Sequence, residues 1–315
     1  MSELNPVVGV GIHATLSLSG FIGNSFILLI HFLDWLKTRE INPCDLIINS
    51  IVLSNIFLQG TVLCNEICFF LFLPFYAQAW VLNSLGAAMA SLAFSSLWCS
   101  TCLCFYYCVK IVNLSGACFY KMKSALPRMV PWLLLFAIAL SWATGLPTYW
   151  DIHRNPLFFV SNSSNNGTPI ITYNLNVKSR CKCLFQIFMM VSAVAFTVIS
   201  ITAGTIIYSL YMHMRRMKQN SEGFTSSKVS SHISAARTIT LLLILYLCFY
   251  GALNAIFNET TEIGTWMFSL CFILVSGFPS INAVILITGN RKLSNFVRKL
   301  FGMKSGTTNS EVSVS

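Results

Sequence analysis

Seven long apolar stretches take up most of the 315-residue chain and limit what it can fold into. The hydrocarbon core of a bilayer is about 30 Å thick, and a helix needs about 20 mostly apolar residues to cross it. All of the stretches reach that length, and they cover residues 7–33, 46–73, 85–112, 129–149, 183–212, 238–257 and 263–288. The sequence therefore predicts a polytopic membrane protein.

The composition supports this interpretation independently. Hydrophobic residues make up 55% of the chain and charged residues only 10%, which is too apolar for a water-soluble domain of this size. Inside lipid every backbone polar group must be paired, so only helices or closed barrels cross, and the stretches lack the alternation of barrel strands. We expect an all-α fold in which residues 1–302 form a bundle of seven transmembrane helices, followed by a disordered cytoplasmic tail over residues 303–315.

The basic residues predict the orientation, because Lys and Arg concentrate in loops that stay in the cytoplasm. Sixteen of the twenty fall in the loops and tail on one side of the predicted bundle, and the other four lie in one loop between Arg154 and Lys182. This places the N-terminus outside. The net charge of +10 then reflects topology and attraction to anionic lipid of the inner leaflet. The basic residues are dispersed among loops, so we expect no nucleic-acid partner.

Three further segments are informative. Leu293, Phe296, Val297, Leu300 and Phe301 recur at helical spacing, which predicts a short interfacial helix over about residues 291–302. The loop over residues 150–182 is long and predicted to be outside, where it either covers the mouth of the bundle or forms a disordered flap. The basic loop over residues 213–237 is the place where a cytoplasmic partner would bind.

Modification and metal binding follow from the same topology. The sequons at Asn162, Asn166 and Asn258 lie on the predicted outer side, where glycosylation is possible. The cysteines of the third stretch could suggest zinc, but a zinc site needs deprotonated thiolates in a closed geometry. We therefore expect neither a metal nor a cofactor. Cys181 and Cys183 lie at the outer end of the fifth crossing, where oxidising conditions permit a disulfide, but Cys-x-Cys neighbours cannot easily pair with each other. The partner stays open, with Cys64 or Cys68 as candidates.

Polar residues inside the predicted helices mark the functional candidates. Asn24, Asn55 and Asn282 lie deep in three different helices and must form hydrogen bonds within the bundle, so we predict that they make one network. Such a network is either static interhelical contact or part of a switch, since each bond is worth only about 0.6 kcal/mol on average. Glu66 is an acidic residue well inside a crossing, and it could pair with a cationic ligand, accept hydrogen bonds from neighbouring helices or face outer water.

A ligand pocket is predicted in the outer halves of the third and seventh helices. Apolar and aromatic side chains there suit dispersion and stacking with small hydrophobic molecules. The candidates are Met89, Ala93, Phe94, Trp98, Trp266, Ser269 and Phe272. The same residues would also suit packed or lipid-facing positions, because one sequence does not fix the rotation of a helix.

Local motifs carry a family resemblance along nearly the whole chain. Residues 23–27 (GNSFI), residues 98–115 (WCSTCLCFYYCVKIVNLS) and residues 279–293 (PSINAVILITGNRKL) are similar to the motifs of the bitter taste receptor family, the type 2 taste receptors. The chain departs from the family at Asn282-Ala283, where His-Ser is usual, and at Asn55, where Arg is frequent. The resemblance is therefore to a divergent member. Vomeronasal type 1 receptors are the nearest rival family.

The resemblance implies a G-protein-coupled receptor at the plasma membrane that binds small-molecule agonists and activates a heterotrimeric G protein of the gustducin-like or inhibitory class. It adds Tyr107 to the inner switch network. It also implies a G-protein-facing set of Lys110, His213, Arg215, Arg216, Lys218 and Arg237. A transporter or channel is the alternative from another class, but charged relays and broken, repeated helices are missing from the sequence. The metalloprotease motif of an intramembrane enzyme is missing too, so we expect no catalysis.

Overall fold

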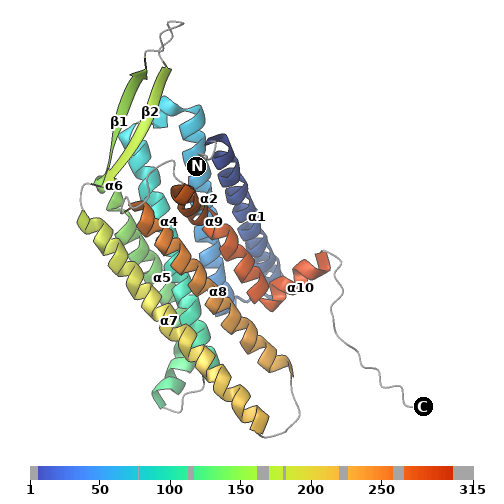
Figure 1. Ribbon diagram of the computed structural model, residues 1–315. Coiled ribbons are helices and arrows are strands. Elements are labelled where there is room, and N and C mark those ends of the chain that lie inside the picture. The colour runs from blue at the N-terminus through green and yellow to red at the C-terminus, as the bar shows by residue number, and fades with distance from the viewer. Residues whose placement is uncertain are drawn as a thin grey trace.

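The computed structural model describes residues 6–76, 78–112, 117–161, 170–179, 182–219, 226–257 and 266–300. Seven long helices run side by side as an elongated bundle (Figure 1). They are α1 (Pro6–Thr38), α2 (Pro43–Leu71), α4 (Ala79–Ile111), α5 (Ala117–Gly145), α7 (Lys182–Gln219), α8 (Ser226–Phe257) and α9 (Trp266–Gly289). Each contains a segment long and apolar enough to cross a membrane, which confirms the predicted seven-helix class.

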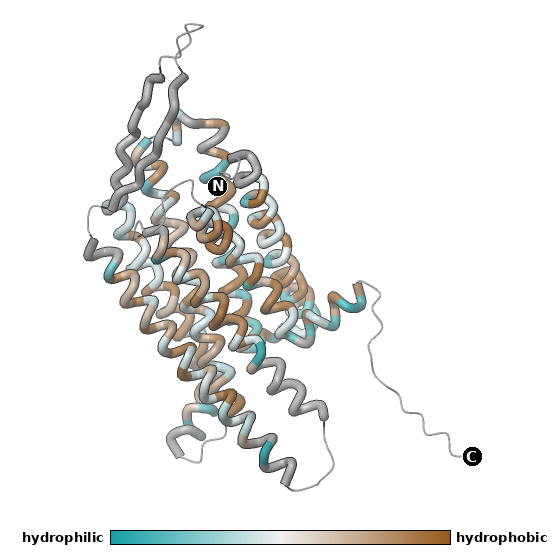
Figure 2. Tube along the Cα trace, viewed as in Figure 1, coloured by the Kyte–Doolittle hydropathy of each residue, from teal (hydrophilic) through white to brown (hydrophobic). Residues whose placement is uncertain are grey.

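The helices of the bundle pack against their neighbours, and α4 lies at the centre. Helix α4 contacts α2, α5, α7 and α8, whereas α1 packs between α2 and α9. Hydrophobic residues run along all of the long helices, and hydrophilic residues gather toward their ends (Figure 2). The start of α1 and the short helix α10 lie at opposite ends of the bundle (Figure 1). We call the end that carries the basic residues the inner end, as their distribution predicts.

Prolines change the ends of two predicted crossings. The second crossing was expected to reach residue 73, but α2 ends at Leu71 and a one-turn helix, α3 (Leu73–Tyr76), follows. Pro74 has no N–H to continue the hydrogen-bond ladder, yet it is tolerated in the first turn of a new helix. The fourth crossing was expected to reach residue 149, but α5 ends at Gly145, and α6 (Thr148–Asp151) follows Pro147.

The interfacial helix predicted after the seventh crossing is α10 (Arg291–Leu300). Its Leu293 is fully buried, and the ring of Phe296 lies 5.9 Å from that of Phe26 on α1, so its apolar side packs on the bundle. Lys292 forms an ion pair with Asp34, which fixes α10 to the inner end of α1. The tail over residues 303–315 lies outside the described residues.

The outer loop after α6 contains two antiparallel strands that the sequence analysis did not predict. Strands β1 (Ile152–Ser161) and β2 (Ile170–Ser179) pair along their whole length, with Ile152 opposite Ser179. The hairpin extends beyond the outer end of the bundle, where β1 contacts α4 and α6 (Figure 1). Pro156 lies within β1, which is acceptable because both strands of a two-stranded sheet are edge strands.

Small residues let the helices approach one another closely. A side-chain carbon built on Gly145 of α5 would lie 2.6 Å from the Cα and the backbone nitrogen of Ser91 on α4. A carbon built on Gly23 of α1 would lie 3.3 Å from the side chain of Ala283 on α9. Close packing of this kind is the main source of helix association in lipid, where apolar burial does not favour one partner over another.

The contact at Gly145 gives the first prediction. Replacing Gly145 by Ala should lower the melting temperature of the purified receptor, because the added methyl group meets backbone that cannot rotate away. Overpacking of this kind costs about 1–3 kcal/mol. Gly204→Ala in α7 is the matched control, since open space surrounds Gly204 and alanine is the better helix former. Equal melting temperatures for the two variants, measured in the same detergent, would contradict the close α4–α5 contact.

Candidate functional site

A chain of buried hydrogen bonds crosses the middle of the bundle. The Asn55 amide on α2 donates to Oδ1 of Asn24 on α1 at 3.3 Å, and the Ser96 hydroxyl on α4 donates to Oδ1 of Asn55 at 2.8 Å. The amide of Asn282 on α9 reaches Oγ of Ser96 at 3.5 Å. All four side chains are fully buried. The structure thus brings the three predicted asparagines together, with Ser96 between them.

Further bonds extend this chain to α8 and to the backbone. The hydroxyl of Tyr246 on α8 lies 2.6 Å from Oγ of Ser100 and 3.2 Å from the carbonyl oxygen of Ser96. The Asn24 amide also donates to the carbonyl oxygen of Pro279 on α9 at 3.2 Å. We call the set Asn24, Asn55, Ser96, Ser100, Tyr246 and Asn282 the Ser96 network. It joins α1, α2, α4, α8 and α9.

The sequence analysis missed Ser96, Ser100 and Tyr246. A serine in a transmembrane helix can bond to its own backbone, as Ser95 does with the carbonyl oxygen of Ser91 at 2.8 Å, so serines give no clear signal. The available signal was spacing. Ser96 and Ser100 lie four residues apart and therefore share one face of α4, where a partner from another helix can reach both.

Tyr107 lies apart from the Ser96 network. It was expected to belong to the inner network, but its hydroxyl accepts a hydrogen bond from the thiol of Cys44 on α2 at 3.4 Å. Eleven residues separate Tyr107 from Ser96 on α4, which is about 16 Å along the axis of a helix. That separation is too large for a direct bond, so Tyr107 connects α2 and α4 near their inner ends instead.

The predicted pocket residues of α4 lie on two different faces. Met89 and Ala93 precede Ser96 and Ser100 at spacings of four, three and four residues, so these four positions form one stripe along α4. Phe94 instead points toward α7, with its ring 4.7 Å from that of Phe188. Trp98, one turn further along the same side, has a buried indole nitrogen without a hydrogen-bond partner in the described structure.

The remaining pocket candidates belong to α9 and α2. Trp266, at the outer end of α9, is 63% exposed, and Ser269 is partly buried. The side chain of Phe272 lies outside the described residues. Glu66 is partly buried on α2, and within the described ranges no basic group lies within ion-pair distance of it.

Aromatic rings pack beside the Ser96 network, between α8 and α9. The Phe278 ring on α9 lies 5.2 Å from the ring of Tyr246 and 4.5 Å from that of Phe249. The Tyr250 ring lies 5.0 Å from that of Phe196 on α7. Sequence reasoning had not selected these residues, because aromatic rings are as common on a lipid-facing side as in a core.

Three of the predicted G-protein-facing cations are exposed at the inner end of the bundle, and each lies on a different helix. Lys110 is exposed at the end of α4, with its ammonium 5.4 Å from the centre of the Tyr106 ring. Arg215 on α7 and Arg237 on α8 are also exposed. His213, Arg216 and Lys218 belong to α7, but their side chains lie outside the described residues.

The modification sites cannot be placed in the same way. Asn162, Asn166, Asn258 and Cys181 lie outside the described ranges, as does the side chain of Cys183. In the part of the chain that is described, no group of three or more His, Cys, Asp or Glu residues could hold a metal ion.

Seven membrane-crossing helices around a buried polar network, with an interfacial helix after the last crossing, define the class of G-protein-coupled receptors. The sequence model of the taste receptor protein family (TAS2R) matches residues 1–305. The chain belongs to this family. The bitter taste receptor function predicted from the sequence is confirmed by this membership, and nothing in the comparisons favours a pheromone receptor, a transporter or an enzyme.

Individual relatives match along most of the chain. Taste receptor type 2 member 7 of Pan troglodytes is 28% identical over 279 residues, which cover 87% of this chain and 86% of the relative. Taste receptor type 2 member 39 of Homo sapiens is 27% identical over 304 residues, which cover 95% of this chain and 88% of the relative. The similarity therefore extends over the whole helix bundle.

The position of Ser96 gives the second prediction. Ser96→Ala should lower the melting temperature of the purified receptor by several degrees, because it removes the donor to Asn55 and the acceptor for Asn282 while both amides stay buried. An unsatisfied buried amide costs about 1–3 kcal/mol. Ser95→Ala is the matched control, since the Ser95 hydroxyl bonds only to its own helix. A Ser96 variant no less stable than the Ser95 variant would contradict the network.

Proposed function

We propose that this taste receptor binds small, largely apolar bitter agonists in the outer half of the bundle and activates a heterotrimeric G protein at its inner end. The G protein is of the gustducin-like or inhibitory class, and the receptor acts at the plasma membrane. Anionic lipid of the inner leaflet surrounds its basic end. The sequons at Asn162, Asn166 and Asn258 would carry sugar on the outer side.

One observation supports the proposal more than any other, namely the stripe on α4. Met89 and Ala93 lie on the same face as Ser96, with Ala93 one turn further out. An agonist that contacts Met89 and Ala93 therefore rests directly above the residue that joins α2, α4 and α9. An agonist with an amine group would have Glu66 on the neighbouring α2 as a partner.

The proposed mechanism is a shift between two arrangements of the helices. An agonist that binds the active arrangement more tightly moves the equilibrium by no more than its difference in affinity between the two states. The Ser96 network has the properties of such a two-state element. Its bonds are short-range and buried, and several of its donors have more than one acceptor within reach, as Tyr246 has Ser100 and the carbonyl of Ser96.

The inner end suits a negatively charged partner. Lys110, Arg215 and Arg237 project from α4, α7 and α8, the three helices that surround the inner mouth of the bundle. Exposed cations accelerate and orient the approach of a complementary surface more than they add affinity. We assign His213, Arg216 and Lys218 to the same surface because they follow or precede Arg215 on α7.

The test of the proposal is agonist-dependent calcium release. Cells that express the receptor with a chimeric G protein are exposed to a panel of bitter compounds, and surface expression is measured in parallel. We expect at least one compound to release calcium only when both proteins are present. Substrate-dependent current in the absence of any G protein would overturn the proposal and indicate transport.

The stripe gives the third prediction. Ala93→Leu should raise the half-maximal concentration of an agonist found in that screen by about tenfold or more, since the larger side chain would occupy the position proposed for the agonist. Ala88→Leu is the matched control, because Ala88 is also partly buried but lies about 140° away from Ala93 around α4. An equal shift in both variants would argue against a site on the stripe.

The inner surface gives the fourth prediction. Arg237→Gln should reduce agonist-stimulated nucleotide exchange on the G protein several-fold without changing agonist binding, because the charge lies at the opposite end from the agonist. The effect should weaken at high salt, as expected for exposed charges. Lys37→Gln at the end of α1 removes the same charge away from the inner mouth and should leave exchange unchanged. Comparable losses in both variants would contradict the assigned surface.

A further inference from the structure

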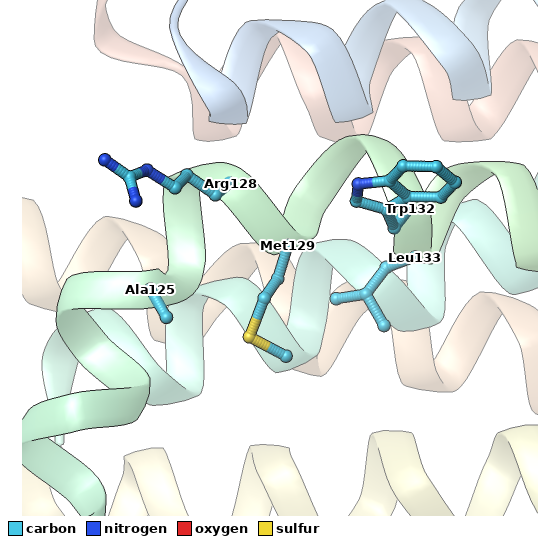
Figure 3. Close-up of a pocket in the computed structure, with 5 residues that line it drawn as sticks. All are labelled: Ala125, Arg128, Met129, Trp132 and Leu133. Atoms are coloured by element: carbon cyan, nitrogen blue, oxygen red, sulfur yellow. The ribbon is translucent and has the colours of Figure 1, made fainter.

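A shallow groove lies on the outward side of α5, near its inner end (Figure 3). Its volume is about 410 Å³, and it is lined by Ala125, Arg128, Met129, Trp132 and Leu133. All five belong to α5, so the groove faces away from the Ser96 network and from the proposed agonist site. Trp132 is 73% exposed, which leaves most of its indole available to a ligand.

The groove has a cationic end and an apolar end. Lys121 and Arg128 are both exposed, and their separation of seven positions amounts to about two helical turns, so they lie on the same side of α5 about 10 Å apart along its axis. Beyond Trp132 the side chains are apolar, with Leu135 and Phe136 largely exposed. Along α5 the cations come first, the indole next and the exposed apolar side chains last. Membrane proteins show the same order from the lipid headgroups into the hydrocarbon.

The two cations have no partner of their own in the described structure. Helix α5 contains no acidic residue, and neither Lys121 nor Arg128 forms an ion pair with any described carboxylate. An exposed guanidinium at the edge of the hydrocarbon gains free energy from a phosphate, which it binds with two parallel hydrogen bonds. The charge of this end of α5 therefore matches an anion.

The prolines of α5 supply the complementary acceptors. Pro127 and Pro131 lie inside the helix and are exposed, and neither has the N–H that would bond to the carbonyl four residues earlier. The carbonyl oxygens of Lys123 and Pro127 therefore lack their usual helical donors. In lipid such groups require another donor, and an ammonium or hydroxyl group of a headgroup can provide one.

We infer that this groove binds an anionic phospholipid of the inner leaflet. Its phosphate lies between Lys121 and Arg128, its headgroup donors reach the free carbonyls, and an acyl chain lies on Met129, Leu133 and Phe136 beside the Trp132 indole. The inference uses the membrane orientation proposed above, but not the agonist or the G protein. Loss of lipid binding and loss of signalling are therefore separate outcomes.

The test measures lipid retention on the intact receptor. Purified wild-type receptor is titrated with phosphatidylserine, with phosphatidylcholine and with inorganic phosphate, and bound lipid is counted by native mass spectrometry. We expect phosphatidylserine to bind about tenfold more tightly than phosphatidylcholine. Inorganic phosphate should bind far more weakly, because it has no chain for the groove. Equal binding of the two lipids would overturn the inference, and so would binding of phosphate as tight as that of phosphatidylserine.

Variants locate the site. Lys121→Gln with Arg128→Gln should weaken phosphatidylserine binding about tenfold and leave phosphatidylcholine unchanged. Lys123→Gln is the matched control. Lys123 is exposed and lies two positions after Lys121, but it points about 140° away from Arg128 around the helix. An equal loss of phosphatidylserine binding from Lys123→Gln would show that the lipid responds to the total charge of this region, and it would contradict binding in the groove.

Two further variants distinguish loss of the lipid site from misfolding of the receptor. Arg128→Lys retains the charge and should keep most of the preference for phosphatidylserine, whereas Met129→Trp fills the groove and should lower binding of the lipid without changing any charge. A Met129→Trp receptor that folds and binds phosphatidylserine as the wild type does would overturn the inference. A change in oligomeric mass, with no change in bound lipid, would instead assign this face to a second receptor and overturn it as well.

Discussion

The hydrogen bonds of Ser96 are the contacts on which the arrangement of the bundle depends. Its hydroxyl meets Asn55 and Asn282, and its carbonyl oxygen lies within reach of Tyr246. Inside lipid a polar group has no water to turn to, so each of these side chains must find its partner in another helix. Apolar packing tolerates small rotations of a helix, whereas these bonds do not. The Ser96 network therefore fixes the rotation of α1, α2, α8 and α9 relative to α4.

Short side chains can meet only where the helices lie close together, and this explains the distribution of small residues. Gly23 faces Ala283 across the α1–α9 contact, near Asn24 and Asn282. Gly20 lies beside Gln59 and Ser280, so it brings α1 near both α2 and α9. Larger residues at these positions would separate the helices beyond the reach of an asparagine. The hydrogen bonds thus depend on the close packing, because short side chains reach a partner only where small residues let the helices approach.

The sequence predicted the features that lipid makes obligatory. A crossing must be long and apolar, and Asn24, Asn55 and Asn282 must pair, so the seven helices and the partnership of the asparagines could be inferred. One sequence does not give the rotation of α4, so it could not show that Phe94 and Trp98 lie on a different face from Met89, Ala93 and Ser96. The contact of Phe94 with Phe188 supplies that rotation. The β1–β2 hairpin was not predicted, although Ile171, Tyr173, Leu175 and Val177 alternate with polar residues as in a strand. The Asn and Ser residues of the same loop are equally typical of a disordered flap.

The inner end of the bundle is held by different contacts on its two sides. Lys292 pairs with Asp34, which ties α10 to α1, and the ring of His31 lies 2.6 Å from Oδ1 of Asn49 and 3.7 Å from Oδ1 of Asp45, which ties α1 to α2. On the other side α8 packs closely on α9, because a side-chain carbon built on Gly289 would lie 2.0 Å from Oγ1 of Thr238. Tyr246 is the member of the Ser96 network that α8 contributes. In the mechanism proposed above, a shift of α8 against the rest of the bundle has to break or exchange the Tyr246 bonds to Ser96 and Ser100. In that mechanism Tyr246 is the point that couples the proposed agonist site to Arg237 on α8.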